Sequence, residues 1–206
     1  MSGSIFLASL FTVLEAYLLG NMNGAIMVSK SVYHSDVRDH GSGNAGLTNF
    51  FRSFGTKALP LVALVDIGKA VLSTLLGGCL LGSCGYAAEG KLLATLFVIV
   101  GHVYPVLYRF RGGKGVLSAF GAMLAVDVRV ALAGLLLFAV IVFFTRYASL
   151  ASLCAVLAGG TVICIRYKTP ASCALALLSV ALVFFAHRSN LQRLARGTEN
   201  KLSFRK

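Results

Sequence analysis

Three separate polar stretches of this sequence contain residue types that can bind an anion, and the first runs from Gly41 to Asn49 and on to Arg52. Glycines allow backbone conformations that other residues avoid, so N–H groups can converge on an anion. The candidate binding residues here are Ser42, Gly43, Asn44, Thr48, Asn49 and Arg52. Taken alone, the stretch fits a phosphate-binding loop or a plain flexible loop equally well. Its match to GxGxxG is too weak to predict a dinucleotide site, because no strand precedes it.

The second stretch begins at Gly101-His102 and ends with Gly112-Gly113-Lys114-Gly115. It combines glycines and cations with a following helix, whose N-terminus attracts anions. It is not a Walker A motif, because Lys114 is followed by Gly115 and not by Ser or Thr. The candidate residues are His102, Gly112, Gly113 and Lys114. The alternative interpretation is a basic turn at a membrane surface.

The third stretch lies near the C-terminus and contains His187-Arg188-Ser189-Asn190 and Glu199. A basic tail that contacts anionic lipid would explain Arg188 and its neighbouring cations. It would not explain His187, Asn190 or Glu199. These three, with Arg188, are therefore candidate site residues.

Three charged residues fall inside apolar segments, where charge is costly and is often functional. Asp66 and Lys69 are three residues apart, so on a helix they lie on one face and can form a pair. They are equally well explained as a site or as a structural pair. Glu15 is a weaker candidate.

The elements that must position these residues are apolar helices. Hydrophobic residues make up 57% of the chain, the mean hydropathy is +0.82 and only 13% of residues are charged, against about 25% in a typical soluble domain. The net charge of +12 does not indicate nucleic-acid binding, because Lys and Arg flank the apolar segments. Apolar helical segments are expected at 5–28, 58–81, 91–108, 116–126, 130–145, 148–165 and 171–186.

These segments predict an all-α, polytopic membrane bundle of about seven transmembrane helices, formed by residues 1–206 as one domain. With the N-terminus outside and the C-terminus cytoplasmic, the three polar stretches all lie inside. Fourteen Lys and Arg residues are then inside and four outside. Asp127 and Arg129 are expected in a turn between two helices, because two charges in mid-membrane would be costly.

The remaining features predict no further chemistry. The five cysteines form no CxxC pair and lie in or beside apolar stretches, so they are expected to pack as small hydrophobic residues. No metal site is expected. The N-terminal MSGS carries no Lys or Arg, which argues against a cleaved signal peptide.

The three stretches together resemble a known family. GSGNAGLTN at 41–49, GHVYPVLYRFRGGKGV at 101–116 and HRSNLQRLARGTENKL at 187–202 are similar, in order and spacing, to the signature stretches of the bacterial acyl-phosphate:glycerol-3-phosphate acyltransferases. The stretch Asp66-Ile67-Gly68-Lys69 also resembles a family pattern. The resemblance covers nearly the whole chain.

This resemblance implies an enzyme of phospholipid biosynthesis in the bacterial inner membrane. The 1-hydroxyl of glycerol 3-phosphate would attack the carbonyl of a fatty acyl phosphate, giving lysophosphatidate and phosphate without a cofactor or metal. His187, Asn190, Lys114 and Arg52 would be catalytic, with His187 as the first candidate for a base and His102 as the second. The other named loop residues, Lys69, Arg188 and Glu199 would bind substrate. The protein is expected to be a monomer that contacts membrane lipid.

Two other functions remain open from the sequence: a transporter of a phosphorylated or anionic solute, and a non-enzymatic membrane scaffold. A transporter needs polar groups near the bilayer midplane with access from both faces. The enzyme requires Ser42, Arg52, Lys114, His187 and Asn190 to line one pocket at the cytoplasmic end, open toward lipid. The backbone N–H groups of 41–44 and 112–115 are expected to point into that pocket.

Overall fold

A computed structural model describes residues 2–202, and within that range the chain is helical with no strand. Arg205 and Lys206, which were counted in the charge bias, lie outside the described residues. The α-helices are α1 (Ser2–Gly20), α2 (Gly24–Tyr33), α3 (Leu47–Phe54), α4 (Leu59–Gly82), α5 (Ala87–Val103), α6 (Val116–Val126), α7 (Val128–Thr145), α8 (Ala148–Tyr167), α9 (Pro170–Ala186) and α10 (Arg188–Ala195). Two single 3-10 turns are η1 (Val37–Asp39) and η2 (Val106–Tyr108). The all-α prediction is confirmed.

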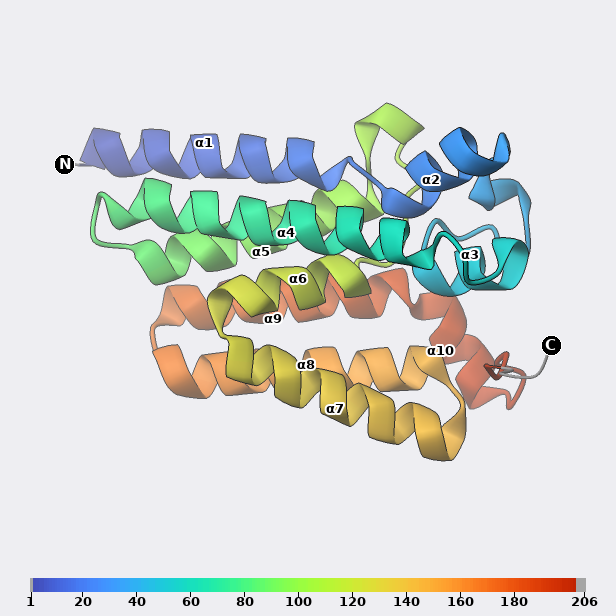
Figure 1. Ribbon diagram of the computed structural model, residues 1–206. Coiled ribbons are helices and arrows are strands. Elements are labelled where there is room, and N and C mark those ends of the chain that lie inside the picture. Colours follow the sequence, from blue (N-terminus) through green and yellow to red (C-terminus); the bar gives the residue numbers. More distant parts are fainter. Residues whose placement is uncertain (1, 203–206) are drawn as a thin grey trace.

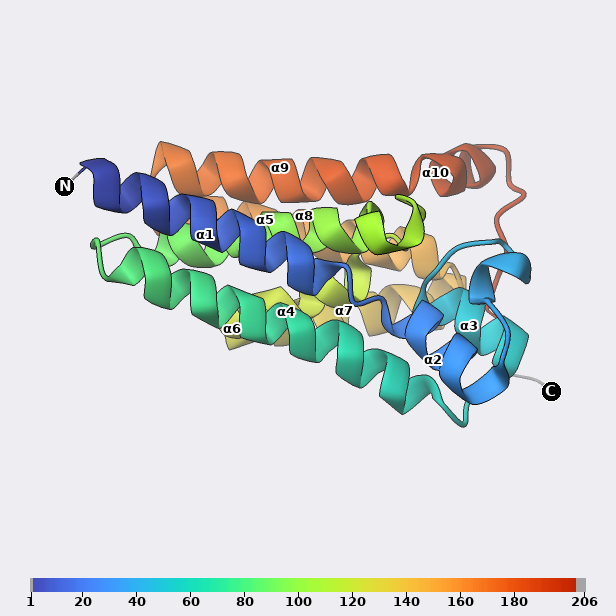
Figure 2. The same ribbon diagram turned by 90° about the horizontal axis from the view of Figure 1, so that it is seen from above.

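The long helices lie side by side and run back and forth along one axis (Figures 1 and 2). The N-terminus and the α4–α5, α6–α7 and α8–α9 turns lie at one end. The opposite end holds α2, α3, α10 and the α5–α6 loop. All three polar stretches therefore lie at the same end of the bundle.

Local sequence signals explain where several helices begin. The Asp127 side chain accepts hydrogen bonds from the N–H groups of Arg129 and Val130 and so caps α7. This is the expected turn at Asp127. Thr169 caps α9 in the same way, immediately before Pro170, whose missing N–H costs nothing in the first turn.

The sequence predicted one continuous helix over residues 5–28, but the structure divides this segment into α1 and α2. The chain breaks at residues 21–23 and restarts with Asn23 as the N-cap of α2, its side chain accepting from the N–H of Ile26. The Lys69 ammonium donates to the exposed carbonyl oxygens of Gly20 (3.2 Å) and Met22 (2.6 Å). A buried cation therefore satisfies the backbone that the break leaves unpaired.

Among the described residues, five helices are long and apolar enough to cross a membrane, α1 with α2 counting as one, and six if α9 and α10 form one bent span. Helix α6 is about 16 Å long at 1.5 Å per residue, which is too short to cross alone. The number of seven crossings therefore stays a prediction, although α6 packs with α4, α5 and α7 as part of the bundle.

Candidate functional site

A cavity of about 460 Å³ opens at the polar end and continues between the helices. It brings together side chains from all three polar stretches. Eleven of the sequence-predicted candidates line it: Ser42, Asn44, Thr48, Asn49, Arg52, Asp66, His102, Lys114, His187, Asn190 and Glu199. The gathering of Ser42, Arg52, Lys114, His187 and Asn190 in one pocket is confirmed.

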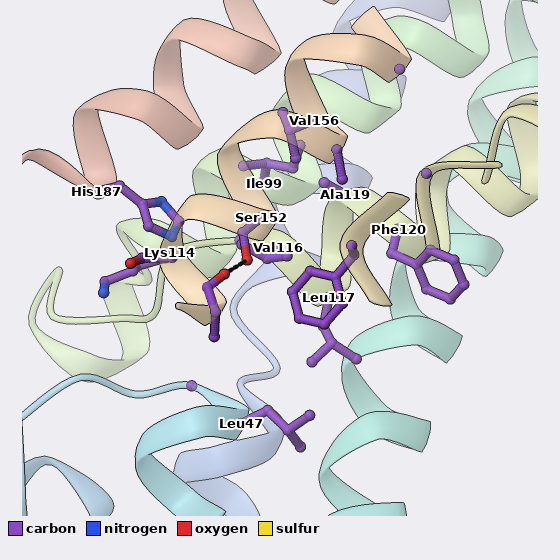
Figure 3. Close-up of a pocket in the computed structure, with 18 of the residues that line it drawn as sticks. Leu47, Ile99, Lys114, Val116, Leu117, Ala119, Phe120, Ser152, Val156 and His187 are labelled. Carbon is purple, nitrogen blue, oxygen red and sulfur yellow. Dashed lines mark hydrogen bonds between the residues drawn. The ribbon is translucent and has the colours of Figure 1, made fainter. Parts of the chain in front are cut away.

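The deeper part of the cavity is apolar. Helix α6 contributes Val116, Leu117, Ala119 and Phe120 (Figure 3). Helices α5, α7, α8 and α9 complete the wall, mainly with aliphatic residues and glycines. Figure 3 shows Lys114 and His187 together on one side, apart from Leu117 and Phe120. The cavity can therefore hold an anionic group at one end and a hydrocarbon chain along the other.

A hydrogen-bonded network fixes the ammonium group of Lys114. It donates to the Asn190 side-chain oxygen, and the Asn190 amide donates to Glu199 at 2.7 Å. Glu199 also accepts from Arg193 (2.8 Å) and Ser149 (2.9 Å). Burial disfavours the Glu199 carboxylate, but these three hydrogen bonds outweigh it and hold its pKa below the usual value.

Burial also acts on Lys114. Burial lowers the pKa of the Lys114 ammonium to about 8. The negative charge of Glu199 raises this pKa, whereas the positive charges of Arg193 and Arg52 lower it further. The polar end therefore carries a concentrated positive charge that is incompletely neutralised. An anion that entered would relieve this repulsion.

The ring of His187 lines the cavity. Its Nδ1 lies 2.8 Å from the carbonyl oxygen of Val183, which can only accept a hydrogen bond, so Nδ1 carries a proton. In the neutral form of the ring, Nε2 is then an acceptor. A substrate hydroxyl could donate to that atom.

The Asn49 side chain holds the first loop through three hydrogen bonds. The buried Asn49 side chain accepts from the N–H of Ser42 (2.9 Å) and donates to the carbonyls of Val37 and His40 (3.0 Å each). Its amide is therefore occupied, although it borders the cavity. The N–H of Gly43 bonds to His40. The expectation that the amides of 41–44 all point inward is wrong for Ser42 and Gly43.

In the second loop, the expectation that the backbone N–H groups point into the cavity is wrong for Gly112 and Gly113. The N–H groups of Gly112 and Gly113 donate to the carbonyls of Val103 and His102. Both glycines are required by close packing: a Cβ on Gly112 would meet the His102 carbonyl, and one on Gly113 would meet His102 Nε2 and the Ala45 carbonyl. They shape the loop, and neither they nor Gly43 line the cavity.

Two helix N-termini at the cavity are suited to an anion instead. Helices α3 and α6 have the glycines Gly46 and Gly115 as N-cap residues and so no side-chain cap, and residues of both first turns line the cavity. The first N–H groups of a helix have no intrahelical acceptor, and the helix dipole favours an anion there. With Arg52 and Lys114 nearby, the site is suited to two phosphate groups.

Lys69, expected to bind substrate, is buried behind the cavity. Besides Gly20 and Met22, its Nζ donates to Asp66 (2.8 Å) and lies 2.9 Å from His102 Nδ1. Asp66 also accepts from the N–H of Gly24 (3.0 Å). The pair thus holds the α1–α2 break against His102, on which the Gly113 loop packs.

Two further candidates lie away from the cavity lining. Arg188 is exposed, donates to the carbonyl of Phe185 and lies over its ring. Glu15 accepts from Ser73 at 3.3 Å inside the bundle. Sequence reasoning missed Arg193 and Ser149, which hold Glu199, and Asn23, whose amide donates to Ala45 in the first loop at 3.1 Å. The signal available for Arg193 was its positive charge six residues before Glu199, a candidate carboxylate.

Residues 10–197 match the model of a protein family described as Glycerol-3-phosphate acyltransferase. A glycerol-3-phosphate acyltransferase of Finegoldia magna is 40% identical, over 90% of this chain and 92% of that protein. One from Clostridioides difficile is 38% identical, over 93% and 94%. A crystal structure of PlsY (YgiH), an integral membrane glycerol 3-phosphate acyltransferase in its glycerol 3-phosphate form, superposes with a TM-score of 0.85. It is 32% identical, with 95% of this chain and 96% of that one covered.

Proposed function

The chain belongs to the glycerol-3-phosphate acyltransferase family and is a multi-pass membrane acyltransferase, and we propose that its acyl donor is a fatty acyl phosphate. The observation that supports this donor most directly is that one cavity has Lys114, Arg52 and two helix N-termini at its polar end and an apolar wall beyond. Both proposed substrates carry a phosphate, and one carries a hydrocarbon tail.

In the proposed reaction, the 1-hydroxyl oxygen of glycerol 3-phosphate forms a bond to the acyl carbonyl carbon. The bond from that carbon to the phosphate oxygen breaks, and inorganic phosphate leaves with the electron pair. An acyl phosphate is already activated, so positioning and charge stabilisation can supply most of the rate. His187 Nε2 would accept the hydrogen bond of the attacking hydroxyl and then its proton, which would pass on to the leaving phosphate.

The other residues take roles that follow from their positions. Lys114 and Arg52 would neutralise the phosphates, and Asn190 would orient Lys114 with Glu199 behind it. Ser42, Asn44 and Thr48 would donate to substrate oxygens from the first loop and α3. We assign Asn49, Gly43, Gly112, Gly113 and Lys69 to holding the loops.

The donor is tested with the purified protein in detergent. We expect lysophosphatidate to form from glycerol 3-phosphate and palmitoyl phosphate, and palmitoyl-CoA to react far more slowly, because its large head does not fit two small anion sites. Phosphate release and thin-layer chromatography of the lipid product measure both reactions. Equal or faster turnover with palmitoyl-CoA would exclude the proposed donor.

The pKa of Lys114 predicts the alkaline limb of the pH profile. The ammonium is charged below a pKa of about 8 and loses its charge above it. We expect kcat/KM for glycerol 3-phosphate to fall about tenfold per pH unit above that value, because the free enzyme must be protonated to bind the phosphate. In Lys114→Arg the residual activity should show no such limb, since arginine stays charged. An unchanged limb in Lys114→Arg would assign it to another group.

We also propose that the protein acts as a monomer in the bacterial inner membrane, with the polar end in the cytoplasm. The positive charge at that end and the lining of the cavity by one chain support this. Single cysteines at the exposed positions 40, 111 and 195, in a background without the five native cysteines, should react with an impermeant maleimide only in inside-out vesicles. Position 83, exposed in the opposite turn, serves as the control and should react in right-side-out cells.

A further inference from the structure

A second pocket of about 320 Å³ lies at the polar end and shares no lining residue with the catalytic cavity. Its wall comes from α2, the segment around η1 and the η2 turn: Lys30, Arg38, Asp39, Leu107, Tyr108, Arg109 and Arg111. Four of these seven side chains are cationic. The proposed reaction makes no use of this basic pocket.

The pocket is rigidly built around Arg38. Its guanidinium donates to both oxygens of Asp36, and its remaining nitrogen donates to the carbonyls of Tyr108 (3.0 Å) and Arg111 (3.3 Å). These bonds tie two segments that are 70 residues apart. The hydrogen bonds from Arg38 also hold the pKa of Asp36 well below its usual range, so that carboxylate stays charged. Arg38 is therefore a structural cation, and Asp36 neutralises its charge.

The cations that remain for a ligand are presented by the η2 turn and α2. Arg109 and Phe110 both adopt left-handed backbone conformations with φ of 57°, and the N–H groups of 109–111 bond within the turn. Arg109 and Arg111 are exposed, as is Lys30, which also pairs with Asp36 at 3.2 Å. The four cations outnumber the two carboxylates of Asp36 and Asp39, so the pocket has a net positive charge that favours binding of an anion.

An apolar rim indicates where that anion comes from. Val106, Leu107 and Phe110 of the same turn are 47%, 70% and 58% exposed. In Figure 1 this yellow-green turn, between α5 and α6, stands out from the bundle beside α2. Exposed apolar side chains beside cations at the end of a membrane bundle match the boundary between acyl chains and lipid headgroups. A soluble phosphate would give these three side chains no partner.

We propose that this basic pocket binds the phosphate headgroup of an anionic phospholipid, with Arg109, Arg111 and Lys30 contacting the phosphate and Leu107 and Phe110 entering the acyl region. The enzyme then carries a lipid site separate from its catalytic cavity. Such a site selects anionic lipid from the surrounding bilayer, because each cation near the surface attracts it independently of the substrate.

The chain contains no tryptophan, so Leu107→Trp places a single indole reporter at the rim. In nanodiscs, brominated phosphatidylglycerol should quench its emission more strongly than brominated phosphatidylcholine at the same mole fraction. Adding Arg109→Gln and Arg111→Gln should weaken the apparent affinity for phosphatidylglycerol by about fivefold per cation removed. The matched control is Arg196→Gln with Lys201→Gln, which removes the same charge from the same end and should leave the preference intact.

Equal quenching by the two brominated lipids would overturn the proposal. So would an equal loss in the Arg196/Lys201 control, which would show general attraction to the surface. Loss of the preference on adding inorganic phosphate or glycerol 3-phosphate at constant ionic strength would identify a site for soluble phosphate instead. None of these readings depends on the acyl donor, so the proposal and the proposed function fail separately.

Discussion

Replacing Lys114 by methionine should lower kcat/KM for glycerol 3-phosphate by about 10²- to 10³-fold, the scale for losing one preorganised charge-stabilising group. Methionine keeps the length and apolar volume of the lysine stem, so the half-buried side chain should still fit. What disappears is the charge that Asn190 and Glu199 hold in place. Initial rates against both substrates measure the loss.

Two comparisons make this result specific. Arg188→Met removes a charge from the same end but outside the cavity lining, so it should leave kcat/KM nearly unchanged. Glu199→Gln keeps Lys114 but weakens its support, so its effect should be smaller than that of Lys114→Met. Thermal unfolding in detergent should be similar for all three. Near-wild-type kinetics in Lys114→Met would contradict the proposed site.

Lys69→Met should destabilise the folded protein by about 3–5 kcal/mol, because it leaves the carboxylate of Asp66 buried without its cation. It also removes the donor to the Gly20 and Met22 carbonyls at the α1–α2 break. Unfolding in mixed detergent–SDS micelles measures the loss. At permissive temperature the remaining folded enzyme should have a raised KM, because the break supports both loops through Asn23 and His102.

The double variant Asp66→Asn/Lys69→Met separates pairing from simple side-chain loss. Removing both charges should restore part of the stability, with a coupling of at least about 1 kcal/mol between the two positions. Ser83→Ala, at the exposed end of α4, is the matched control and should change little. Additive effects at positions 66 and 69 would show that the two charges do not stabilise one another.

Two kinds of feature could be predicted from the sequence: the long apolar helices and the residues at which a helix begins or ends. The segment expected at 148–165 is α8 at Ala148–Tyr167, and the turn expected at Asp127 divides α6 from α7. A long apolar run and a capping residue act locally, so both can be read from neighbouring residues. The five residues expected in one pocket also meet there, because helices of alternating direction return every polar stretch to the same end.

The unpredicted features depend on partners far along the chain. Nothing near Ser149 indicates that it will hold Glu199, fifty positions away. Asn49 and Lys69 have the residue types of ligands, yet they bond to the protein's own backbone. The break at 21–23 lies in a window that is apolar on average, although Asn23 is a local capping signal for it. Lys69, which donates to the carbonyls that the break exposes, lies in another helix. The roles assigned to the site residues stay proposals.

The two ends of the catalytic cavity come from different parts of the chain, and this has a consequence for divergence among relatives. The polar end is built by loops, α3 and α10, whereas α7, α8 and α9 supply much of the apolar wall. At Gly159 in α8, an added methyl group would touch its nearest neighbours, Met123 and Val130, at an ordinary 3.9 Å. On the proposed function, substitutions there would shorten the space for hydrocarbon without disturbing the groups proposed to bind phosphate. Natural selection could then change which chain lengths the enzyme transfers while its chemistry is inherited unaltered.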